Sequence, residues 1–194
     1  VDAKPRDYVP EPERATFQGI KRPDGSVATR NYLGVMTSVN CSATAARMIA
    51  DSITEQELQN YPNVDGVVAY THGTGCGQAA SGLGWDFLQA TINGYKGHPN
   101  FAGMLMVGLG CEVNQVAGMM ERHDWQQDDA FQAMTIQDVG GTMATVREGV
   151  ARLKEMLPIA NGVTRETLPA SYLKLGLECG GSDAYSGISA NPSL

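Results

Sequence analysis

The four cysteines of this chain recur at nearly regular intervals, and each follows an apolar run rich in strand-forming residues. They are Cys41, Cys76, Cys111 and Cys179, so the intervals are 35, 35 and 68 residues, about one, one and two times a single length. A strand, a crossover helix and the next parallel strand take roughly 30 residues or more. The spacing therefore predicts that the cysteines lie at successive strand ends, on the sheet edge where open α/β proteins bind their ligands.

Strand-like and helix-like segments alternate along the chain, which is typical of an α/β fold with a doubly wound, mostly parallel sheet and flanking helices. We predict a Rossmann-like sheet of about five strands. The predicted strands cover residues 32–39, 64–70, 104–109, 131–136 and 173–177. The predicted helices cover residues 43–53, 83–95, 115–122 and 142–156, with Ser42 and Thr142 as N-caps and with Gly97 and Pro158 ending two of them.

The two ends of the chain differ in character from its middle. Residues 1–16 are polar and contain three prolines, which predicts a linker from a missing N-terminal domain. Residues 17–194 are predicted to form a central α/β domain. Because the glycine- and serine-rich end SDAYSGISANPSL has no closing helix after it, we expect that this domain is truncated before a C-terminal portion.

Composition excludes several classes of function. A hydrophobic content of 42% and a charged content of 18% are ordinary for a soluble globular protein. The net charge of −7, without a basic stripe, argues against nucleic-acid binding, which depends on phosphate neutralisation. No apolar run approaches the roughly 20 residues of a membrane span, and no signal peptide is visible. We therefore expect a cytoplasmic protein with neither a nucleic-acid nor a membrane partner.

The cysteines themselves allow two interpretations. Four cysteines could form two disulfides, but free thiols in a reducing cytoplasm are favoured because the chain is large and lacks a secretion signal. No CxxC pair occurs, which disfavours a zinc ribbon or a thioredoxin-type site. Neither GxGxxG after the first strand nor GxxxxGK[ST] is present, so the dinucleotide and P-loop fingerprints are absent from the sequence.

The most informative motif is the run THGTGCGQ at residues 71–78. Its three glycines allow close approach of the backbone to a ligand and expose N–H groups near a helix start. His72 has an ordinary pKa near neutrality, which suits proton transfer or metal ligation. The alternative is a tight turn between strand and helix with a hydrogen-bonded histidine, and we favour the functional interpretation because a thiol and three glycines accompany the ring.

Three further segments carry groups with useful chemistry. GLGCEVNQ at residues 108–115 offers a thiol, a carboxylate and two amides, or else a simple helix start with Glu112 near the dipole and Asn114 as cap. ECGGSD at residues 178–183 combines two carboxylates and a thiol, which suits a hard cation or a substrate. Arg30 stands just before the first buried strand and could pair with a carboxylate, although an exposed arginine is the commoner case.

Five segments together resemble the altronate/galactarate dehydratase family, sugar-acid hydro-lyases that also include a sulfolactate sulfo-lyase. The segments are FQGIKRPDGSVATRNYLGV with VNCS, HGTGCGQ, HPNFAGMLMVGLGCEVNQ, IQDVGGT and LKLGLECGGSDAYSGISANP, in family order from Phe17 to Pro192. The family loop is often HPYGCSQ-like where this chain has HGTGCGQ. The resemblance implies a metal-dependent dehydration of a sugar acid, such as altronate or galactarate, to a 2-keto-3-deoxy acid. It also implies a small N-terminal domain and a substantial C-terminal portion in the full-length enzyme.

This chemistry assigns roles to residues of the motifs. Removing the proton beside a carboxylate builds up enediolate charge, and a second group must protonate the departing hydroxyl. We predict His72 and Cys76 as catalytic groups. The predicted substrate-binding residues are Arg30, Asn31, Gly75, Gln78, Gly180 and Ser182. The predicted metal ligands are Cys111, Glu112, Cys179 and Asp183.

The cofactor and partners follow from the same resemblance. Thiol ligands favour iron(II), while the carboxylates also admit magnesium, manganese or calcium. We expect a small sugar acid as substrate, the missing N- and C-terminal portions as partners, a homo-oligomer, and little activity of the isolated fragment. The alternatives are a non-catalytic assembly domain of such an enzyme, a C–S lyase of the sulfolactate type and, less favoured, a redox-sensing thiol protein.

Overall fold

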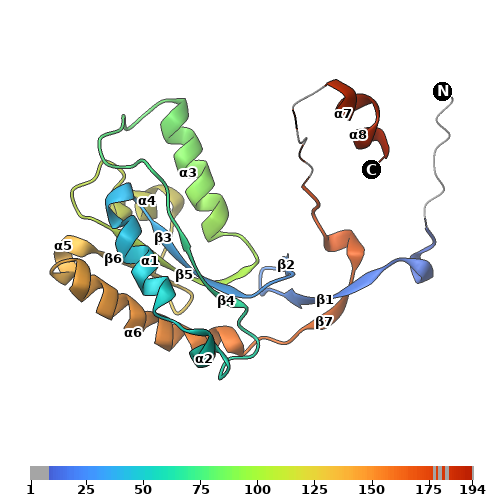
Figure 1. Ribbon diagram of the computed structural model, residues 1–194, viewed down its shortest axis with the longest axis horizontal. Coiled ribbons are helices and arrows are strands. Elements are labelled where there is room, and N and C mark those ends of the chain that lie inside the picture. The colour runs from blue at the N-terminus through green and yellow to red at the C-terminus, as the bar shows by residue number, and fades with distance from the viewer. Residues whose placement is uncertain (1–8, 177, 179–180, 182–183, 194) are drawn as a thin grey trace. The chain divides into compact units, whose positions relative to one another are not determined.

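The computed structural model of this chain describes residues 9–176, 178, 181 and 184–193 (Figure 1). The chain divides into two compact units. One covers residues 18–167 and contains the parallel sheet, and the other combines residues 1–17 with residues 168–194. Each unit is described by itself.

The larger unit is built around a sheet of four parallel strands, which are β3 (Tyr32–Thr37), β4 (Gly66–Tyr70), β5 (Phe101–Gly108) and β6 (Phe131–Thr135). Their order in the sheet is β4-β3-β5-β6, so the chain leaves β3 toward one side and returns to the other side for β5. In such an open sheet, the loops after the strands where the order reverses border the ligand crevice. The predicted parallel α/β sheet is confirmed.

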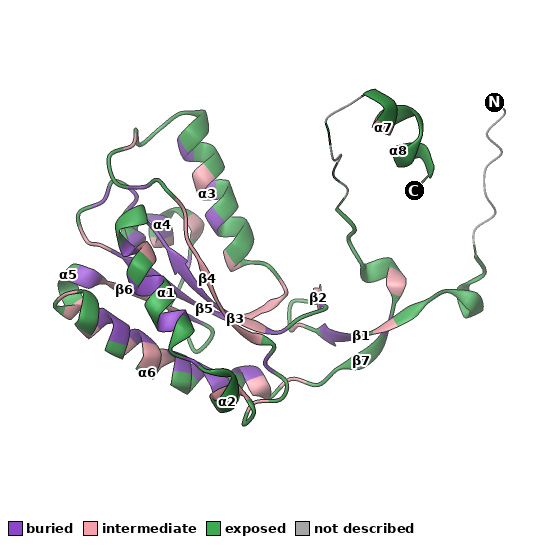
Figure 2. Ribbon diagram, viewed as in Figure 1, coloured by how far each residue is buried: buried purple, intermediate pink, exposed green. Residues whose placement is uncertain are grey.

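Helices cover both faces of this sheet (Figure 1). α1 (Ala43–Asp51) and α6 (Thr142–Asn161) pack on one face, and α3 (Leu83–Lys96) and α4 (Val116–His123) pack on the other. Side chains alternate between the faces of a strand, so Leu33 and Val35 face the α1 side whereas Met36 faces the α3 side. Figure 2 shows the buried stripes of the helices turned toward the strands.

Three predicted helix ends differ from the structure. The N-cap of α6 is Gly141, and Thr142 is its first helical residue. The Ser42 side chain does not cap α1, because its buried hydroxyl lies 2.9 and 2.7 Å from the carbonyl oxygens of Val39 and Val107 and shares its one hydrogen between them. α6 does not stop at Pro158 and continues to Asn161. Pro158 lies on the exposed face of the helix, while Leu157 and Ala160 are buried in the core, so packing maintains the last turn.

Three shorter helices connect these elements. They are the 3-10 helix η2 (Asn40–Ser42), α2 (Glu55–Leu58) and α5 (Ile136–Val139). Thr54 caps α2 and Thr135 caps α5, each by accepting a backbone N–H three residues further on. Gly97 forms the C-cap of α3, as the sequence predicts.

A second, three-stranded sheet has the order β2-β1-β7. Its strands are β1 (Thr16–Lys21), β2 (Val27–Ala28) and β7 (Glu166–Pro169). β1 and β2 run antiparallel, and the turn between them uses Gly25 at φ 85°. The predicted fifth strand of the parallel sheet is wrong for its described residues 173–176, which form no strand and are exposed. An alternating apolar pattern makes a strand only where one face is buried, and Leu175 is 80% exposed.

The smaller unit contains η1 (Glu11–Glu13), η3 (Ala170–Tyr172), α7 (Ala184–Ile188) and α8 (Ala190–Ser193). Its two chain segments are joined by a hydrogen bond from the Ala170 N–H to the Ala15 carbonyl at 2.8 Å. Within the described residues of the whole chain, no helix combines the length and apolar character needed to cross a membrane.

Candidate functional site

Three loops meet at the carboxyl edge of the parallel sheet. We call them together the carboxyl edge, and they are residues 38–42 after β3, residues 71–82 after β4 and residues 109–115 after β5. Each loop presents one exposed cysteine without a disulfide, namely Cys41, Cys76 and Cys111. The prediction that these three cysteines follow successive parallel strands is confirmed. Cys179 lies outside the described residues, as do the candidates Gly180, Ser182 and Asp183.

Backbone hydrogen bonds lock the three loops against one another. The Asn40 N–H donates to the Thr74 carbonyl at 2.8 Å, and the Asn114 N–H donates to the Gly75 carbonyl at 3.1 Å. Gly75 has φ 101°, and a Cβ there would collide with the Ser38 carbonyl oxygen and lie 2.9 Å from the Val39 Cα. This candidate residue is therefore a glycine because the second loop passes directly over the end of β3.

Glu112 is the buried charge of the carboxyl edge, with 2% of its surface exposed. Its Oε1 accepts from the Ser38 hydroxyl at 2.7 Å and from the Leu109 N–H at 3.0 Å, and its Oε2 accepts from the Gly110 N–H at 2.5 Å. Burial raises the pKa of this carboxyl, but the hydrogen bonds outweigh it and hold the pKa below its usual range. In this arrangement the carboxylate joins the loops after β3 and β5.

A buried amide chain continues behind Glu112 and was missed by the sequence reasoning. Asn114 donates to the Ser38 carbonyl at 2.8 Å and accepts from the Gln89 amide at 2.6 Å. Gln89 in turn meets His123 Nε2 at 3.2 Å. Asn114 is therefore not the N-cap of α4, a place that Gln115 takes. The available signal was Gln89 itself, a polar residue between apolar neighbours on the inward face of its helix.

His72 lies at the end of β4 with both ring nitrogens engaged. Its Nδ1 accepts from the Thr74 N–H at 3.3 Å, so the proton is on Nε2, which donates to the Thr37 carbonyl at 3.1 Å. Thr74 Oγ1 lies 3.0 Å from Nδ1. Burial lowers the pKa of His72 and outweighs its backbone hydrogen bonds with Thr37 and Ser38, which raise it. The ring is neutral at neutral pH and is braced against β3.

Cys76 and Cys41 approach each other from the loops after β4 and β3. A hydrogen bond with the Cys41 thiol is the main cause that raises the pKa of Cys76, and the charges of Cys41 and Glu112 act in the same direction. Both thiols are exposed. A raised pKa keeps Cys76 in its thiol form, not the thiolate form, at neutral pH.

Unpaired polar atoms concentrate at the same edge. Among the described residues, the buried side-chain atoms without a hydrogen-bond partner are Thr37 Oγ1, Gln78 Nε2 and Trp85 Nε1. Thr37 ends β3, Gln78 lies in the loop after β4, and Trp85 lies in the first turn of α3. Buried polar groups are normally paired, so their concentration here marks the carboxyl edge as the place where partners are lacking.

Two further candidates, Arg30 and Asn31, precede β3 at the opposite edge of the sheet, in what we call the amino-edge network. This network also contains Arg22, Asn63, Asp65, Asn161 and Arg165. Asn31 is fully buried, and its side chain donates to the carbonyls of Asn63 and Ala160 and accepts from Arg22.

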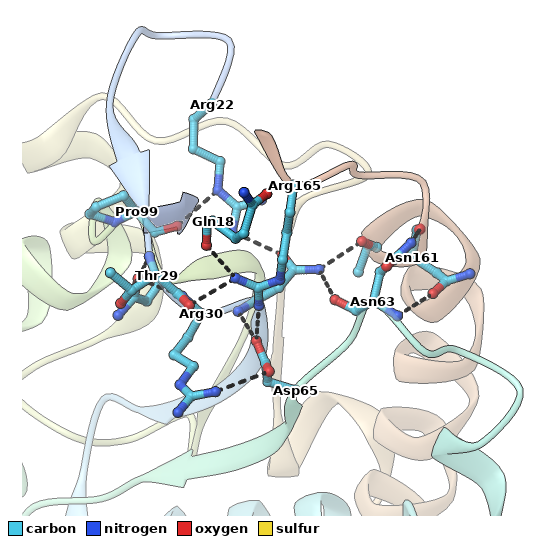
Figure 3. A network of polar contacts seen from close by, with 12 residues as sticks. Gln18, Arg22, Thr29, Arg30, Asn63, Asp65, Pro99, Asn161 and Arg165 are labelled. Atoms are coloured by element: carbon cyan, nitrogen blue, oxygen red, sulfur yellow. Dashed lines mark hydrogen bonds and ion pairs between the residues drawn. The ribbon is translucent and has the colours of Figure 1, made fainter. Parts of the chain in front are cut away.

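Asp65 is the carboxylate of the amino-edge network. Its Oδ2 accepts from the Asn31 N–H at 2.6 Å and from Arg165 at 3.0 Å, and Arg30 lies 3.6 Å from Oδ1 (Figure 3). The structure thus does not bring Arg30 and Asn31 together with His72 and Cys76. Both residues precede β3, and the amino ends of parallel strands lie at the edge away from the thiol-bearing loops.

The predicted metal ligands are only partly in view. Cys111 is exposed, Glu112 is held by three donors, and the other two predicted ligands lie outside the described residues. Within the described part of the chain, no group of three or more His, Cys, Asp or Glu side chains is arranged to hold a metal ion. The described donors by themselves therefore do not form a metal centre.

A parallel α/β sheet with reactive side chains on the loops at its carboxyl edge defines an α/β protein with an enzyme-like site. Residues 19–161 match the family model described as D-galactarate dehydratase/Altronate hydrolase, second domain. Residues 170–194 match the one described as D-galactarate/Altronate dehydratase, C-terminal. The chain belongs to the D-galactarate/altronate dehydratase family, as its sequence motifs predict.

Individual relatives agree with this assignment. The chain is 37% identical to the altronate dehydratase of Bacillus subtilis (strain 168), covering 94% of this chain and 35% of the relative. It is 39% identical to the galactarate dehydratase (L-threo-forming) of Escherichia coli (strain K12), covering 96% and 38%. It is 27% identical to the (2R)-sulfolactate sulfo-lyase subunit beta of Chromohalobacter salexigens, covering 92% and 42%. The chain thus spans little more than a third of the length of the dehydratases that it matches.

Proposed function

We propose that this protein contributes the second-domain part of a hydro-lyase that removes water from a sugar acid, such as altronate or galactarate, to give a 2-keto-3-deoxy acid. The observation that carries the proposal is the convergence of three family motifs, VNCS, HGTGCGQ and GLGCEVNQ, at the carboxyl edge of one sheet. The proposal is also supported by the altronate and galactarate dehydratases, whose similarity extends over nearly the whole of this chain.

The two catalytic candidates have protonation states that suit a dehydration. His72 is neutral because its pKa is lowered. Once the hydrogen bond from the Thr74 N–H to Nδ1 breaks, Nδ1 can accept the proton from the carbon next to the substrate carboxylate. The electron pair of that C–H bond forms the carbon–carbon double bond, and the neighbouring C–O bond breaks. Cys76 donates its proton to the departing hydroxyl, which leaves as water. The enol then tautomerises to the keto acid.

We also propose that the complete enzyme depends on a divalent metal, with iron(II) favoured over magnesium, manganese and calcium. Thiolates suit a borderline metal and carboxylates a harder one, and Cys111 and Glu112 supply one donor of each kind. The metal would stabilise the enediolate charge. Cys179 and Asp183 are the proposed remaining ligands. Incubation with a chelator should abolish keto-acid formation, and re-addition of iron(II) should restore it.

The proposed setting of the enzyme is a cytoplasmic homo-oligomer in which the chain works with further N- and C-terminal portions. The further portions are supported by the length of the dehydratase relatives, which is more than twice that of the part that this chain matches. Light scattering on the purified protein measures the oligomeric state directly, and a monomer at working concentration would contradict the oligomer.

Two alternatives each have an observation in their favour. The match to a sulfolactate sulfo-lyase subunit favours C–S bond cleavage at the same edge. Exposed apolar side chains on α3, with Leu83 at 73% and Phe87 at 67%, favour a non-catalytic domain that assembles with other portions. Product analysis separates the three possibilities, because dehydration gives keto acid without sulfite, C–S cleavage gives keto acid together with sulfite, and an assembly domain gives neither.

The decisive experiment supplies altronate, galactarate and sulfolactate to the full-length enzyme that contains this chain, with added divalent metals, and measures keto acid and sulfite. His72→Gln and Cys76→Ser should each reduce keto-acid formation by about a hundredfold or more. His98→Gln is the matched control, because His98 lies before β5 at the other edge of the sheet. Absence of keto acid from every sugar acid, or full activity of both site variants, overturns the proposal.

A further inference from the structure

A series of hydrogen-bonded side chains leads from the end of α4 to the carboxyl edge. It starts at His123, the last residue of α4, whose Nε2 lies 3.2 Å from Gln89 Oε1. Gln89 belongs to α3, and its Nε2 donates to Asn114 Oδ1 at 2.6 Å. Asn114, in the loop after β5, donates to the Ser38 carbonyl at 2.8 Å. Gln89, Asn114 and Ser38 are at most 4% exposed, so these bonds form away from bulk water.

The direction of every hydrogen bond in this series is set by its inner end. The Ser38 carbonyl can only accept, so Asn114 turns its NH₂ group toward that carbonyl and its Oδ1 toward α3. Gln89 must then donate with Nε2, which turns its Oε1 toward α4. The His123 Nε2 therefore carries a proton. One backbone carbonyl of the carboxyl edge thus orients two amides and one imidazole.

Gln89 is not the residue that helix packing alone would favour at its position. It shares the buried face of α3 with Trp85 and Ile92, where an apolar side chain would suffice. A buried amide gives up its bonds to water, and its net contribution to stability is small even when it is paired. A fully paired buried network does, however, fix one geometry. The benefit of Gln89 therefore lies in the geometry that it imposes on Asn114.

Asn114 and its neighbour hold the loop that carries Cys76. The Asn114 N–H donates to the Gly75 carbonyl at 3.1 Å. The Val113 N–H donates to the Cys76 carbonyl at 3.2 Å. The Asn114 side chain also bonds the Ser38 carbonyl, which is the same carbonyl against which Gly75 packs. A displacement of Asn114 would therefore disturb the support of Cys76 from the loops after β3 and β5 together.

From these contacts we infer that Asn114 is a positioning residue for Cys76, and that Gln89 and His123 fix the orientation of its amide. This inference rests on the proposed function, in which Cys76 protonates the departing hydroxyl. The three residues act through the loop after β4 and not on the substrate itself. A proton donor works only within hydrogen-bond reach of the departing oxygen, so a displaced thiol slows the chemical step more than it weakens substrate binding.

The kinetic test compares two substitutions on α3 in the full-length enzyme that contains this chain. Gln89→Leu removes the link between α4 and Asn114, so kcat for keto-acid formation should fall by about tenfold while KM changes by less than about twofold. Asn114→Asp, which places an oxygen against the Ser38 carbonyl, should have the same effect. Asn93→Leu is the matched control, because Asn93 accepts from the Trp125 indole at 3.2 Å and not from a loop of the carboxyl edge. Its kcat should be unchanged, and an equal loss in Gln89→Leu and Asn93→Leu overturns the inference.

A pair of substitutions at His123 tests the outer end of the series. Glutamine can place an N–H group where the His123 Nε2 stands, whereas leucine cannot donate. His123→Gln should therefore keep kcat within about twofold of the unmodified enzyme, and His123→Leu should approach the loss seen in Gln89→Leu. Equal kcat values of the two His123 variants contradict the role assigned to His123.

The chemical reactivity of Cys76 gives a second readout, which does not depend on catalysis. Alkylation by iodoacetamide is followed at each cysteine by mass spectrometry of the peptides. The hydrogen bond with Cys41 is the main cause that raises the pKa of Cys76, so a displaced loop should lower that pKa. Alkylation of Cys76 at neutral pH should then be about threefold faster or more in Gln89→Leu, and unchanged in Asn93→Leu. An unchanged rate in Gln89→Leu overturns the inference.

The two readouts together separate this inference from the proposed function. Faster alkylation of Cys76 in Gln89→Leu, in an enzyme that forms no keto acid from any sugar acid, supports the positioning of Cys76 while the proposed function fails. Keto-acid formation with unchanged kcat and unchanged alkylation in Gln89→Leu defeats the inference while the proposed function stands.

Discussion

The two edges of the parallel sheet are built from similar polar residues but differ in how those residues are satisfied. At the amino edge, the oxygen and nitrogen of the Asn31 amide and both oxygens of Asp65 have protein partners. At the carboxyl edge, Thr37, Gln78 and Trp85 each retain a buried atom without a partner. The first arrangement is typical of structure, and the second is typical of a place that receives a ligand.

This difference gives a practical criterion for locating function. Both edges contain charged groups, so charge alone does not separate them. What separates them is the number of unfilled hydrogen-bonding positions together with exposed thiols on the loops. Substitutions at the two edges should therefore change the free energy of unfolding to different extents.

The largest effect is expected from Asn31→Ala at the amino edge. The substitution removes the partner of the Asn63 carbonyl, of the buried Ala160 carbonyl and of the Arg22 Nη2, while Arg22 Nε still donates to the Pro99 carbonyl. The free energy of unfolding should fall by about 3 kcal/mol, measured by urea denaturation. Arg30→Ala is the matched comparison, because that exposed ion pair should contribute less than about 1 kcal/mol. A raised KM in Arg30→Ala would instead support its predicted role in substrate binding.

A smaller loss is expected from Glu112→Gln at the carboxyl edge. The amide keeps one acceptor but turns an NH₂ group toward a backbone N–H, so we expect a loss of about 2 kcal/mol in the free energy of unfolding. The stabilising contribution of the native carboxylate should disappear as the pH falls through its lowered pKa, because the unfolded chain takes up the proton first. Acid titration followed by circular dichroism should show this loss of stability in the unmodified protein and not in Glu112→Gln.

Thr37→Val, in contrast, is not expected to lower the free energy of unfolding. The hydroxyl of Thr37 is buried without a partner, and valine has nearly the same shape. The free energy of unfolding should stay unchanged or rise by up to about 1 kcal/mol. A clear loss of stability would show that the hydroxyl is satisfied, and it would weaken the contrast between the edges.

The smallest effect concerns pH and His72. Because the pKa of His72 is lowered in the folded protein, the unfolded chain binds a proton there more readily. The contribution of the neutral ring to the free energy of unfolding is therefore complete above about pH 6.5 and is lost as the pH falls below that value. Unfolding measured at pH 7.5 and pH 5.5 should show a modest loss in the native protein. His72→Gln should reduce that loss, and an unchanged pH dependence would contradict the assignment of a neutral, half-buried ring.

Much of the fold was predictable because it depends on local patterns. The interval between cysteines predicted the placement of Cys41, Cys76 and Cys111, since strand and crossover helix together have a nearly fixed length. The fifth strand failed because the apolar alternation in residues 173–176 has no face to bury against within the described residues. Pro158 did not end α6 because burial of the neighbouring turn outweighs a proline on the exposed face.

The candidate site was predictable as a set of loops but not as a set of contacts. Arg30 was predicted to bind substrate because it is close in sequence to β3. Residues that precede a parallel strand, however, lie at the amino edge of the sheet, away from the loops that carry the thiols. The bond between Ser38 and Glu112 spans 74 positions and follows from strand order, which no local pattern encodes. Trp85 was missed because an indole in an amphipathic helix is ordinarily a core residue, and only the absence of a partner distinguishes it.

Gly75 has a consequence for how the chain can change. A methyl group at this position would strike the Ser38 carbonyl and part the loop from β3, so the Asn40 to Thr74 bond would open as well. The spacing between the loops that carry Cys41 and Cys76 thus depends on the absence of a Cβ atom at this position. Substitutions elsewhere in the loop alter its chemistry, whereas a substitution at this residue alters the distance at which that chemistry operates.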